Sequence, residues 1–384
     1  MHEYCQALLD SCRPLYAGSD ATLTERVLHI VKSAIDSAAA PKQPIGVGDL
    51  AFPSLRAAVA LCPGTRVQLV FHRPESVTSF PPKSADSQQC PEAGARPPRL
   101  HGTPHKIAAR IDLVGSYLLR SLARPCLNVD LAVTMPGVCL SRKDYLNHRY
   151  TAKRAMYLGV VSTAVLQAFG LCGEGRKISS DGNSGHGTEH VARDHSGAPV
   201  VTASIAAFRG DVSKPVLVLH VRGRVQQNAC SVLANAAQNF TVRIFPCIAA
   251  DSFPPSKLLH LRNNVRVQFP CRVPYYAPAT PRYTNGILED MCFSRHLRVL
   301  HTAARKCSAF SDCCMLLKIW LRRRFGMAGE SPDTFNGFLL SMILAHVIES
   351  EEIVNRQMSP LQLFRGTLQF LADIDLTSNP QVRN

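Results

Sequence analysis

The sequence predicts an α+β domain followed by an all-helical one. Between about residues 106 and 245, short segments rich in β-branched residues, such as 129–134 and 216–221, alternate with helical patterns. From about residue 285 onward, the apolar residues recur only at helical spacing. The composition, 46% hydrophobic and 18% charged, is typical of folded domains, and a chain of 384 residues can form two of them.

The N-terminal segment is predicted to be helical. Apolar residues recur at helical spacing across residues 4–40, with a break between Pro14 and Asp20. We therefore assign residues 1–65 to an N-terminal helical region. A strand is expected next at 66–72, where the run Arg-Val-Gln-Leu-Val-Phe-His is rich in strand-forming residues.

Two low-complexity insertions interrupt the α+β domain. Residues 73–104 are rich in Pro, Ser and Gly, and residues 173–198 form a polar, glycine-rich loop. A long helix is predicted between the two insertions, at 145–171. Strands are predicted on both sides of that helix, at 129–134, 200–208, 216–221 and 240–245.

The α+β domain is assigned to residues 66–280 and the helical domain to residues 281–384. A change from mixed to purely helical patterning places the boundary near residues 275–285. The helices predicted in the second domain are 285–304, 309–323, 334–350 and 360–372.

The chain is strongly basic. It has 43 Lys and Arg residues against 28 Asp and Glu, a formal charge of +15 at pH 7. Such a surplus favours contact with polyanions, nucleic acid before acidic membranes.

Cysteine spacing and apolar runs exclude several classes of protein. The 14 cysteines include no Cys-x-x-Cys pair, which indicates reduced thiols and no structural zinc. The longest apolar run, 338–348, is too short to cross a bilayer. Because the N-terminus also lacks a signal-peptide pattern, we expect a soluble protein with no membrane partner.

The run Leu113-Val-Gly115-Ser116 and the segment Asn128-Val-Asp130 have the outline of a nucleotidyltransferase site. In that superfamily a Gly-Ser turn opens a helix, expected here to have about ten residues, and donates backbone N–H groups to nucleotide phosphates. The next strand presents two carboxylates on one face because they are two residues apart. With a third carboxylate from a later strand, they hold two metal ions roughly 4 Å apart.

The carboxylates of that site are missing from the sequence. The first acid position is occupied by the neutral Asn128, which leaves only Asp130. No Asp or Glu lies between Asp211 and Asp251, where the later strands fall. That stretch instead carries cations, Lys214, Arg222, Arg224 and Arg243. We therefore expect no catalytic residue, metal or cofactor, and we interpret Gly115, Ser116, Asn128 and Asp130 as a vestigial site. The alternative is an ordinary strand-to-helix turn beside a surface acid.

Two basic segments are candidates for contact with RNA or a protein partner. The predicted helix that begins at about Ser141 interleaves cations with tyrosines, which can hold phosphates and stack on bases. Its candidate residues are Arg142, Lys143, Arg149, Tyr150, Lys153 and Arg154. The alternative is a solvated helix face. The triplet Arg322, Arg323 and Arg324 ends another helix, where it suits either a phosphate or the negative end of the helix dipole.

Other motifs do not reach the level of a site. His186, His190 and His195 lie in the glycine-rich insertion, where nothing preorganises them as metal ligands. The run from Gly170 to Ile178 lacks the Gly-Lys-Ser/Thr core of a phosphate-binding loop.

From residue 106 onward, long runs of the chain match one known family. The matching runs are 114–120, 128–136, 143–150, 153–158, 242–246, 263–266, 280–285, 287–290, 316–323 and 335–342. Over these runs the chain resembles the nucleolar RNA-associated protein (Nrap) family of the eukaryotic small-subunit processome. The segments 316–323, Leu-Leu-Lys-Ile-Trp-Leu-Arg-Arg, and 335–342 are also similar to the helical domain of poly(A) polymerases.

The resemblance implies a nucleotidyltransferase-like domain followed by a poly(A)-polymerase/OAS-like helical domain, a pair that has lost catalysis. It implies a scaffold in pre-rRNA processing and ribosome biogenesis, located in the nucleus and nucleolus. The implied partners are pre-rRNA, the U3 ribonucleoprotein and other processome proteins. Family members are much longer, so the resemblance covers only their first domain pair. The other hypotheses are an active RNA nucleotidyltransferase that uses Asp130, and a scaffold that binds only proteins.

Overall fold

The computed structural model describes residues 2–14, 19–60, 67–71, 106–125, 127–171, 190–191, 200–222, 239–265, 278–326, 335–350 and 357–374. The predicted insertion 73–104 lies outside these residues, as does 173–198 apart from residues 190 and 191. His186 and His195 therefore lie outside the described residues.

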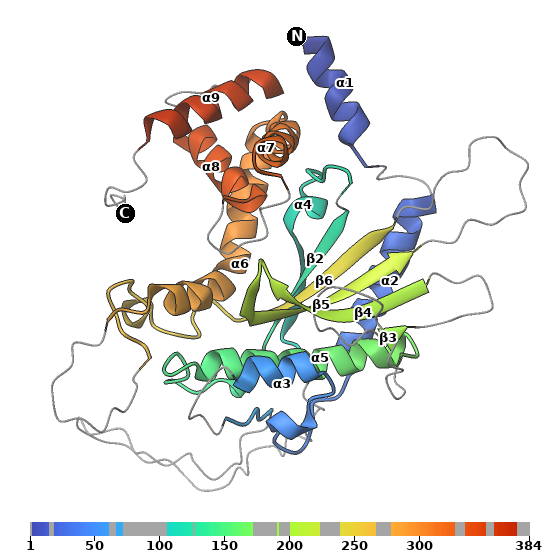
Figure 1. Ribbon diagram of the computed structural model, residues 1–384, viewed down its shortest axis with the longest axis vertical. Coiled ribbons are helices and arrows are strands. Elements are labelled where there is room, and N and C mark those ends of the chain that lie inside the picture. The colour runs from blue at the N-terminus through green and yellow to red at the C-terminus, as the bar shows by residue number, and fades with distance from the viewer. Residues whose placement is uncertain are drawn as a thin grey trace, which may run out of the picture.

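A six-stranded mixed sheet forms the centre of the first part of the chain (Figure 1). Its strands lie in the order β1-β2-β6-β5-β4-β3. Among the described strands, only the pair β2–β6 is parallel, and the other neighbours are antiparallel. The bounds are β1 Arg110–Val114, β2 Asn128–Thr134, β3 His190–Val191, β4 Val200–Phe208, β5 Asp211–Arg222 and β6 Phe240–Cys247.

Three helices cover one face of the sheet, and α3 and α5 lie below it in Figure 1. They are α2 (Ser19–Ser37), α3 (Pro53–Ala60) and α5 (Arg149–Ala168), and their apolar side chains share one core with the strands. Helix α5 is buried along most of its length. A Cβ atom on Gly159 would lie 2.6 Å from Leu50 Cδ2, so α5 needs glycine there to approach its neighbours.

Two sequence expectations differ from the observed elements. The strand expected at 66–72 is reduced to an isolated bridge between Leu69 and Ile45 in the described part of that segment. The long helix begins at Arg149 instead of residue 145 because Asn147 and His148 have left-handed φ angles of 55° and 57°.

The helix after the Gly-Ser turn is also shorter than expected. Helix α4 (Gly115–Leu118) is a single turn, because Arg120 adopts a left-handed φ of 50°. The Ser121 and Arg120 N–H groups donate to the Ser116 and Tyr117 carbonyl oxygens, which is the hydrogen-bond pattern of a Schellman helix end. This ending has no sequence signal because arginine replaces the usual glycine.

The C-terminal part is helical, as predicted. Its helices within the described residues are α6 (Pro281–Lys306), α7 (Phe310–Phe325), α8 (Gly337–Ser350) and α9 (Pro360–Asp373). Their buried residues form a second core. The first half of α6 packs into the sheet core through Ile287 and Met291, and its second half packs into the helical core through Leu300 and Ala303. The proposed boundary at residue 281 thus falls at the start of a helix that serves both cores.

Helix α1 (His2–Cys12) packs on the C-terminal helices and not beside α2 and α3 (Figure 1). Leu9 is buried against Met315 and Leu316 of α7. Arg13 Nη2 also lies 2.6 Å from Asp312 Oδ1. The proposed N-terminal helical region therefore contributes to two different cores.

The cysteines among the described residues are all free thiols. Burial raises the pKa of both Cys139 and Cys247 to about 12, so these two thiols stay protonated at neutral pH. No helix in the described ranges is long and apolar enough to span a membrane.

Candidate functional site

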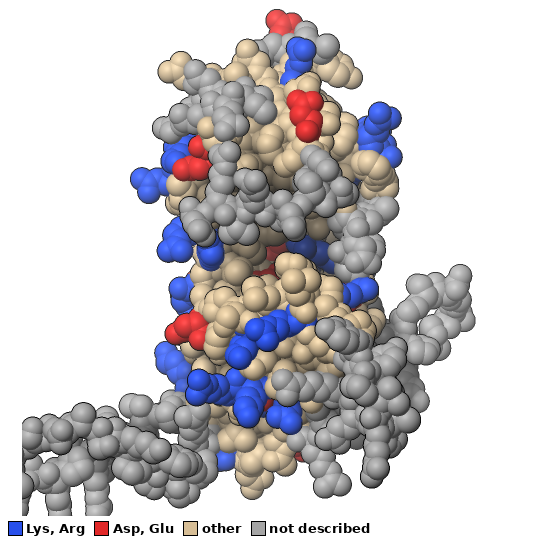
Figure 2. Space-filling view, turned by 90° about the vertical axis from the view of Figure 1, so that its left-hand side faces the viewer, with Lys and Arg blue, Asp and Glu red and all other residues tan. Residues whose placement is uncertain are grey.

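A cavity of about 450 Å³ lies between the sheet and the C-terminal helices. The four residues of the vestigial site all line it. The opposite wall comes from α7 and α8 and includes Lys318, Arg322 and Phe338. Figure 2 shows a hollow between the upper, helical half of the molecule and its lower half. We call this cavity the cleft.

Gly115 allows the turn that opens the cleft. Its φ of 76° is a conformation that residues with a side chain rarely adopt, and a Cβ atom here would lie 2.8 Å from Asp130 Oδ2. The backbone of the turn at Gly115 therefore packs directly against the Asp130 carboxylate of β2.

Helix α7 holds this turn from the other side of the cleft. Lys318 Nζ donates to Ser116 Oγ at 2.7 Å, to the Ser121 carbonyl oxygen at 2.8 Å and to Ser121 Oγ at 3.1 Å. Burial lowers the pKa of the Lys318 ammonium to about 8, even though nearby Cys314 and Asp130 favour its charged form. The Ser116 hydroxyl is thus already bonded by a cation from the helical part of the chain.

Asp130 is held by an arginine of the neighbouring parallel strand. Arg243 Nε and Nη2 donate to the two carboxylate oxygens at 2.7 and 2.9 Å. The two residues are register partners on β2 and β6. Their side chains are 14% and 32% exposed, so the pair lies at the edge of the cleft and remains in contact with water.

Asn128 is also hydrogen-bonded to a side chain of β6. Thr241, its register partner on β6, donates from Oγ1 to Asn128 Oδ1 at 2.5 Å. Both strand positions that carry metal ligands in nucleotidyltransferases are therefore bonded to side chains of β6. Among the described residues, no group of three or more His, Cys, Asp or Glu side chains is arranged to hold a metal ion.

The remaining cleft wall carries a second arginine on aromatic rings. The Arg209 guanidinium lies 4.8 Å from the centre of the Phe208 ring and 5.4 Å from that of Phe338. It also lies 3.2 Å from Glu289 Oε1. Burial lowers the pKa of Arg209, with Glu289 acting in the opposite direction. The cleft thus presents arginine and lysine side chains around the strand carboxylate of Asp130.

Comparison with known proteins identifies the family. Two family models match: Nrap protein domain 1 over residues 104–171 and 187–306, and the Nrap protein PAP/OAS-like domain over residues 309–384. The chain belongs to the Nrap family. It is 34% identical to Nucleolar protein 6 of Mus musculus over 326 residues, which is 81% of this chain and 24% of the mouse protein.

Other relatives in the Nrap family show the same partial coverage. The chain is 34% identical to Nucleolar protein 6 of Homo sapiens over 317 residues, 79% of this chain and 24% of the human protein. It is 26% identical to Nucleolar protein 6 of Drosophila melanogaster over 276 residues, 69% of this chain and 19% of the fly protein. The chain spans about a quarter of the length of the two mammalian relatives.

Three of the residues expected to contact RNA or a partner are buried in this Nrap chain. Tyr150, Lys153 and Arg154 are 2%, 8% and 2% exposed. Lys153 Nζ lies 2.7 Å from Asp144 Oδ2. Because these side chains point into the fold, they are not exposed for contact with RNA or a partner at the surface, and they stabilise the helix against its neighbours.

Asp290 on α6 is the partner of the other two buried residues. It accepts hydrogen bonds from Arg154 Nε and the Tyr150 hydroxyl, both at 2.8 Å, and its other oxygen lies 3.0 Å from Lys214 Nζ. Burial acts against the charge of Arg154, but Asp290, Tyr150 and Glu289 together outweigh burial, and the pKa of Arg154 is raised. Sequence reasoning missed Asp290 because its partners come from distant segments.

The other candidate contacts are exposed or serve the cleft. Arg142, Lys143 and Arg149 are exposed. Arg322 donates to the carbonyl oxygens of Ala123 and Arg124 at 3.0 and 3.2 Å, so it helps to hold the loop after α4. Its neighbours Arg323 and Arg324 are exposed at the end of α7.

Proposed function

We propose that this Nrap chain is a non-catalytic, RNA-binding part of a scaffold in the small-subunit processome, acting in pre-rRNA processing and ribosome biogenesis. The observation that carries the proposal is the bidentate ion pair between Arg243 and Asp130. It occupies the strand carboxylate that a catalytic metal would need.

The chemistry of nucleotide transfer explains why this contact matters. Two divalent metals activate the attacking hydroxyl and neutralise the leaving group, and carboxylates must hold them. Here the carboxylate of Asp130 is bonded at both oxygens to a guanidinium, and its neighbour on the strand is an amide. Because a fixed positive charge next to the site repels Mg²⁺, we infer that metal binding and catalysis have been lost.

The same cleft remains suited to an anionic ligand. Lys318, Arg209 and Arg243 line it together with aromatic side chains. Cations beside aromatic rings can hold phosphates and stack on bases without any metal. The formal charge of +15 supports contact with a nucleic acid.

The relatives support the cellular setting. They are named Nucleolar protein 6, and the protein is accordingly placed in the nucleus, in the nucleolus. We infer that its partners are pre-rRNA in the context of the U3 ribonucleoprotein, together with other processome proteins. Since the chain spans about a quarter of its relatives, it would contribute the first domain pair of such a scaffold.

The test combines primer extension with RNA binding. The chain is incubated with an RNA primer, nucleoside triphosphates and Mg²⁺ or Mn²⁺, beside an active poly(A) polymerase as a positive control. We expect no extension, together with an RNA affinity that falls steeply as salt rises. Extension that Asp130→Ala abolishes would instead identify an active RNA nucleotidyltransferase. If the chain neither extends the primer nor binds RNA, its partner would be a protein.

A further inference from the structure

A second cavity, of about 460 Å³, lies beneath the start of α6. It is lined by residues from the ends of three segments and by α5 and β5, and it shares no lining residue with the cleft. Its wall includes His148, Thr280, Tyr283 and Gly286. Glu289 lies between the two cavities, because it forms ion pairs with Arg209, which lines the cleft, and with Lys214, which lines the second cavity.

Asn264 fixes the rim of this cavity by joining three segments. Its backbone oxygen accepts from Asn147 N at 2.8 Å. Its side-chain nitrogen donates to the Lys257 carbonyl oxygen at 3.0 Å and to Thr284 Oγ1 at 3.3 Å. Because Asn264 is only 3% exposed, these bonds form a buried polar network that holds segments 141–149, 254–265 and 278–286 in place.

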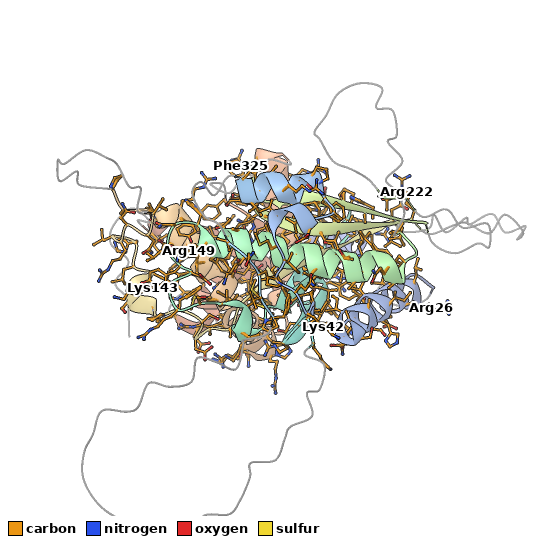
Figure 3. All side chains as sticks on the ribbon, turned by 90° about the horizontal axis from the view of Figure 1, so that it is seen from below. Arg26, Lys42, Lys143, Arg149, Arg222 and Phe325 are labelled. Atoms are coloured by element: carbon orange, nitrogen blue, oxygen red, sulfur yellow. The ribbon has the colours of Figure 1, made fainter. Side chains whose placement is uncertain are left out.

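These three segments carry a concentration of exposed cations. The only acid within them is Asp144, which is buried and paired with Lys153. Figure 2 shows Lys and Arg gathered in the lower half of this side of the molecule, and Figure 3 shows Lys143 and Arg149 at the same end. The exposed cations of the rim are Arg142, Lys143, Arg149, Lys257, Arg262 and Arg282.

An aromatic pair lines this cavity. The rings of His148 and Tyr283 are 4.4 Å apart, and both residues are half-buried. Burial lowers the pKa of His148, so its imidazole is neutral at pH 7 and adds no repulsion to the surrounding cations. At the cavity floor, Asp290 contacts both Arg154 and Lys214, Lys214 also pairs with Glu289, and Asp211 is a second carboxylate in the lining.

We propose that this surface binds single-stranded RNA, with one unpaired nucleotide in the cavity against His148 and Tyr283 and the flanking phosphates on the rim cations. The proposal rests on the RNA-binding function proposed above and assigns it to a site outside the cleft. A cavity of this volume is large enough for a nucleoside, and base stacking on rings is a usual mode of single-strand recognition. Duplex RNA is a poor fit because its bases are already stacked and paired.

The test measures binding of a fluorescent 12-nucleotide oligouridine, by anisotropy across a KCl series, to the full chain and three variants. Lys143→Glu/Arg149→Glu reverses two rim charges. Arg26→Glu/Arg222→Glu makes the same change of charge with exposed residues at the opposite end of the molecule (Figure 3). Gly286→Leu fills the cavity at a helical position where leucine is favoured over glycine.

We expect Lys143→Glu/Arg149→Glu to weaken binding about tenfold or more at 100 mM salt and to flatten its salt dependence, since two phosphate contacts are lost. Arg26→Glu/Arg222→Glu should change the affinity about twofold at most. Gly286→Leu should lower the affinity while leaving the salt slope unchanged. Oligonucleotides with 4-thiouridine should crosslink on irradiation to peptides that contain His148 or Tyr283.

Three results would overturn the proposal. Unchanged affinity in Lys143→Glu/Arg149→Glu, with crosslinks to the cleft strands, would leave the RNA-binding function intact and move its site. Equal loss of affinity in both double variants would show a non-specific charge effect. Displacement of RNA by polyglutamate without any crosslink to the aromatic pair would indicate an acidic protein segment as the ligand. Absence of RNA binding by the unmodified chain would instead remove the proposed function itself.

Discussion

Asp130 and Asp290 are both bonded to arginine, but their surroundings differ. Asp130 lies at the edge of the cleft, is 14% exposed, and has Arg243 on both of its oxygens. Asp290 is 1% exposed and contacts Arg154, Lys214 and Tyr150 inside the fold. The first is a position where nucleotidyltransferases hold a metal, and the second joins α6 to the sheet and to α5.

The two environments predict different effects on folding stability when each carboxylate is removed. A buried carboxylate that contacts two cations cannot be removed without leaving uncompensated charge in the interior. An ion pair at a wet surface contributes little to folding because water replaces either partner. We therefore expect the two acids to differ sharply when each is removed.

Asp290→Ala should produce the largest loss of stability. It leaves the buried charge of Arg154 without its carboxylate and Lys214 with Glu289 alone, and breaking a comparable buried pair costs about 3–5 kcal/mol. Asp130→Ala is the matched control and should cost about 1 kcal/mol or less. The loss in free energy of unfolding of each variant is to be measured by urea unfolding followed by circular dichroism. Equal losses in the two variants would contradict the distinction between the two sites.

Gly115→Ala should have an intermediate effect. A side chain at a φ of 76° is strained, and its Cβ atom would lie 2.8 Å from Asp130 Oδ2, so we expect a loss of about 1–3 kcal/mol. Gly137→Ala is the control, because no atom lies within 4 Å of the added Cβ and its φ is ordinary. Thermal unfolding of both variants distinguishes a required turn from general sensitivity at glycines.

A third expected effect is a dependence of stability on pH that comes from Lys318. Its pKa falls from the ordinary lysine value of 10.5 to about 8 in the fold, so between these pH values the unfolded chain binds more protons than the folded one. The free energy of unfolding therefore rises with pH across this window. Lys318→Met removes that contribution.

Parallel urea titrations of both proteins at pH 7, 8, 9 and 10 give the measurement. The stability difference between wild type and Lys318→Met should move in favour of the wild type above pH 8, because the buried ammonium then loses its charge. A difference that stays constant from pH 7 to 10 would mean that Lys318 keeps an ordinary pKa.

Much of the fold could be predicted from the sequence. The strand around Asp130 and the C-terminal helices follow from patterns with a period of two or of about 3.6 residues. The ends of helices were harder to predict. The one-turn α4 and the late start of α5 depend on left-handed Arg120, Asn147 and His148, which are not glycines and carry no sequence signal.

The site was predicted only in part, for a similar physical reason. Gly115, Ser116, Asn128 and Asp130 do line one cleft, since a short motif positions them. The sequence does not show which cations of α5 face water, because this depends on the side chains that pack against the helix in the folded protein. Arg154 faces inward because Asp290, 136 positions away in sequence, receives it. Periodicity predicts which residues share one face of a helix. It does not predict which charged side chains from distant segments pack against that face.

The proposed loss of the metal site is tested most directly by a calorimetric titration of the chain with Mn²⁺. Three proteins are compared: wild type, Asp130→Ala, and Asn128→Asp/Arg243→Asp, which places carboxylates around Asp130 again. We predict no specific binding by the wild type or Asp130→Ala, and measurable binding by Asn128→Asp/Arg243→Asp. Stoichiometric Mn²⁺ binding by the wild type that is lost in Asp130→Ala would contradict the proposal, since the contact with Arg243 would then leave a working metal site.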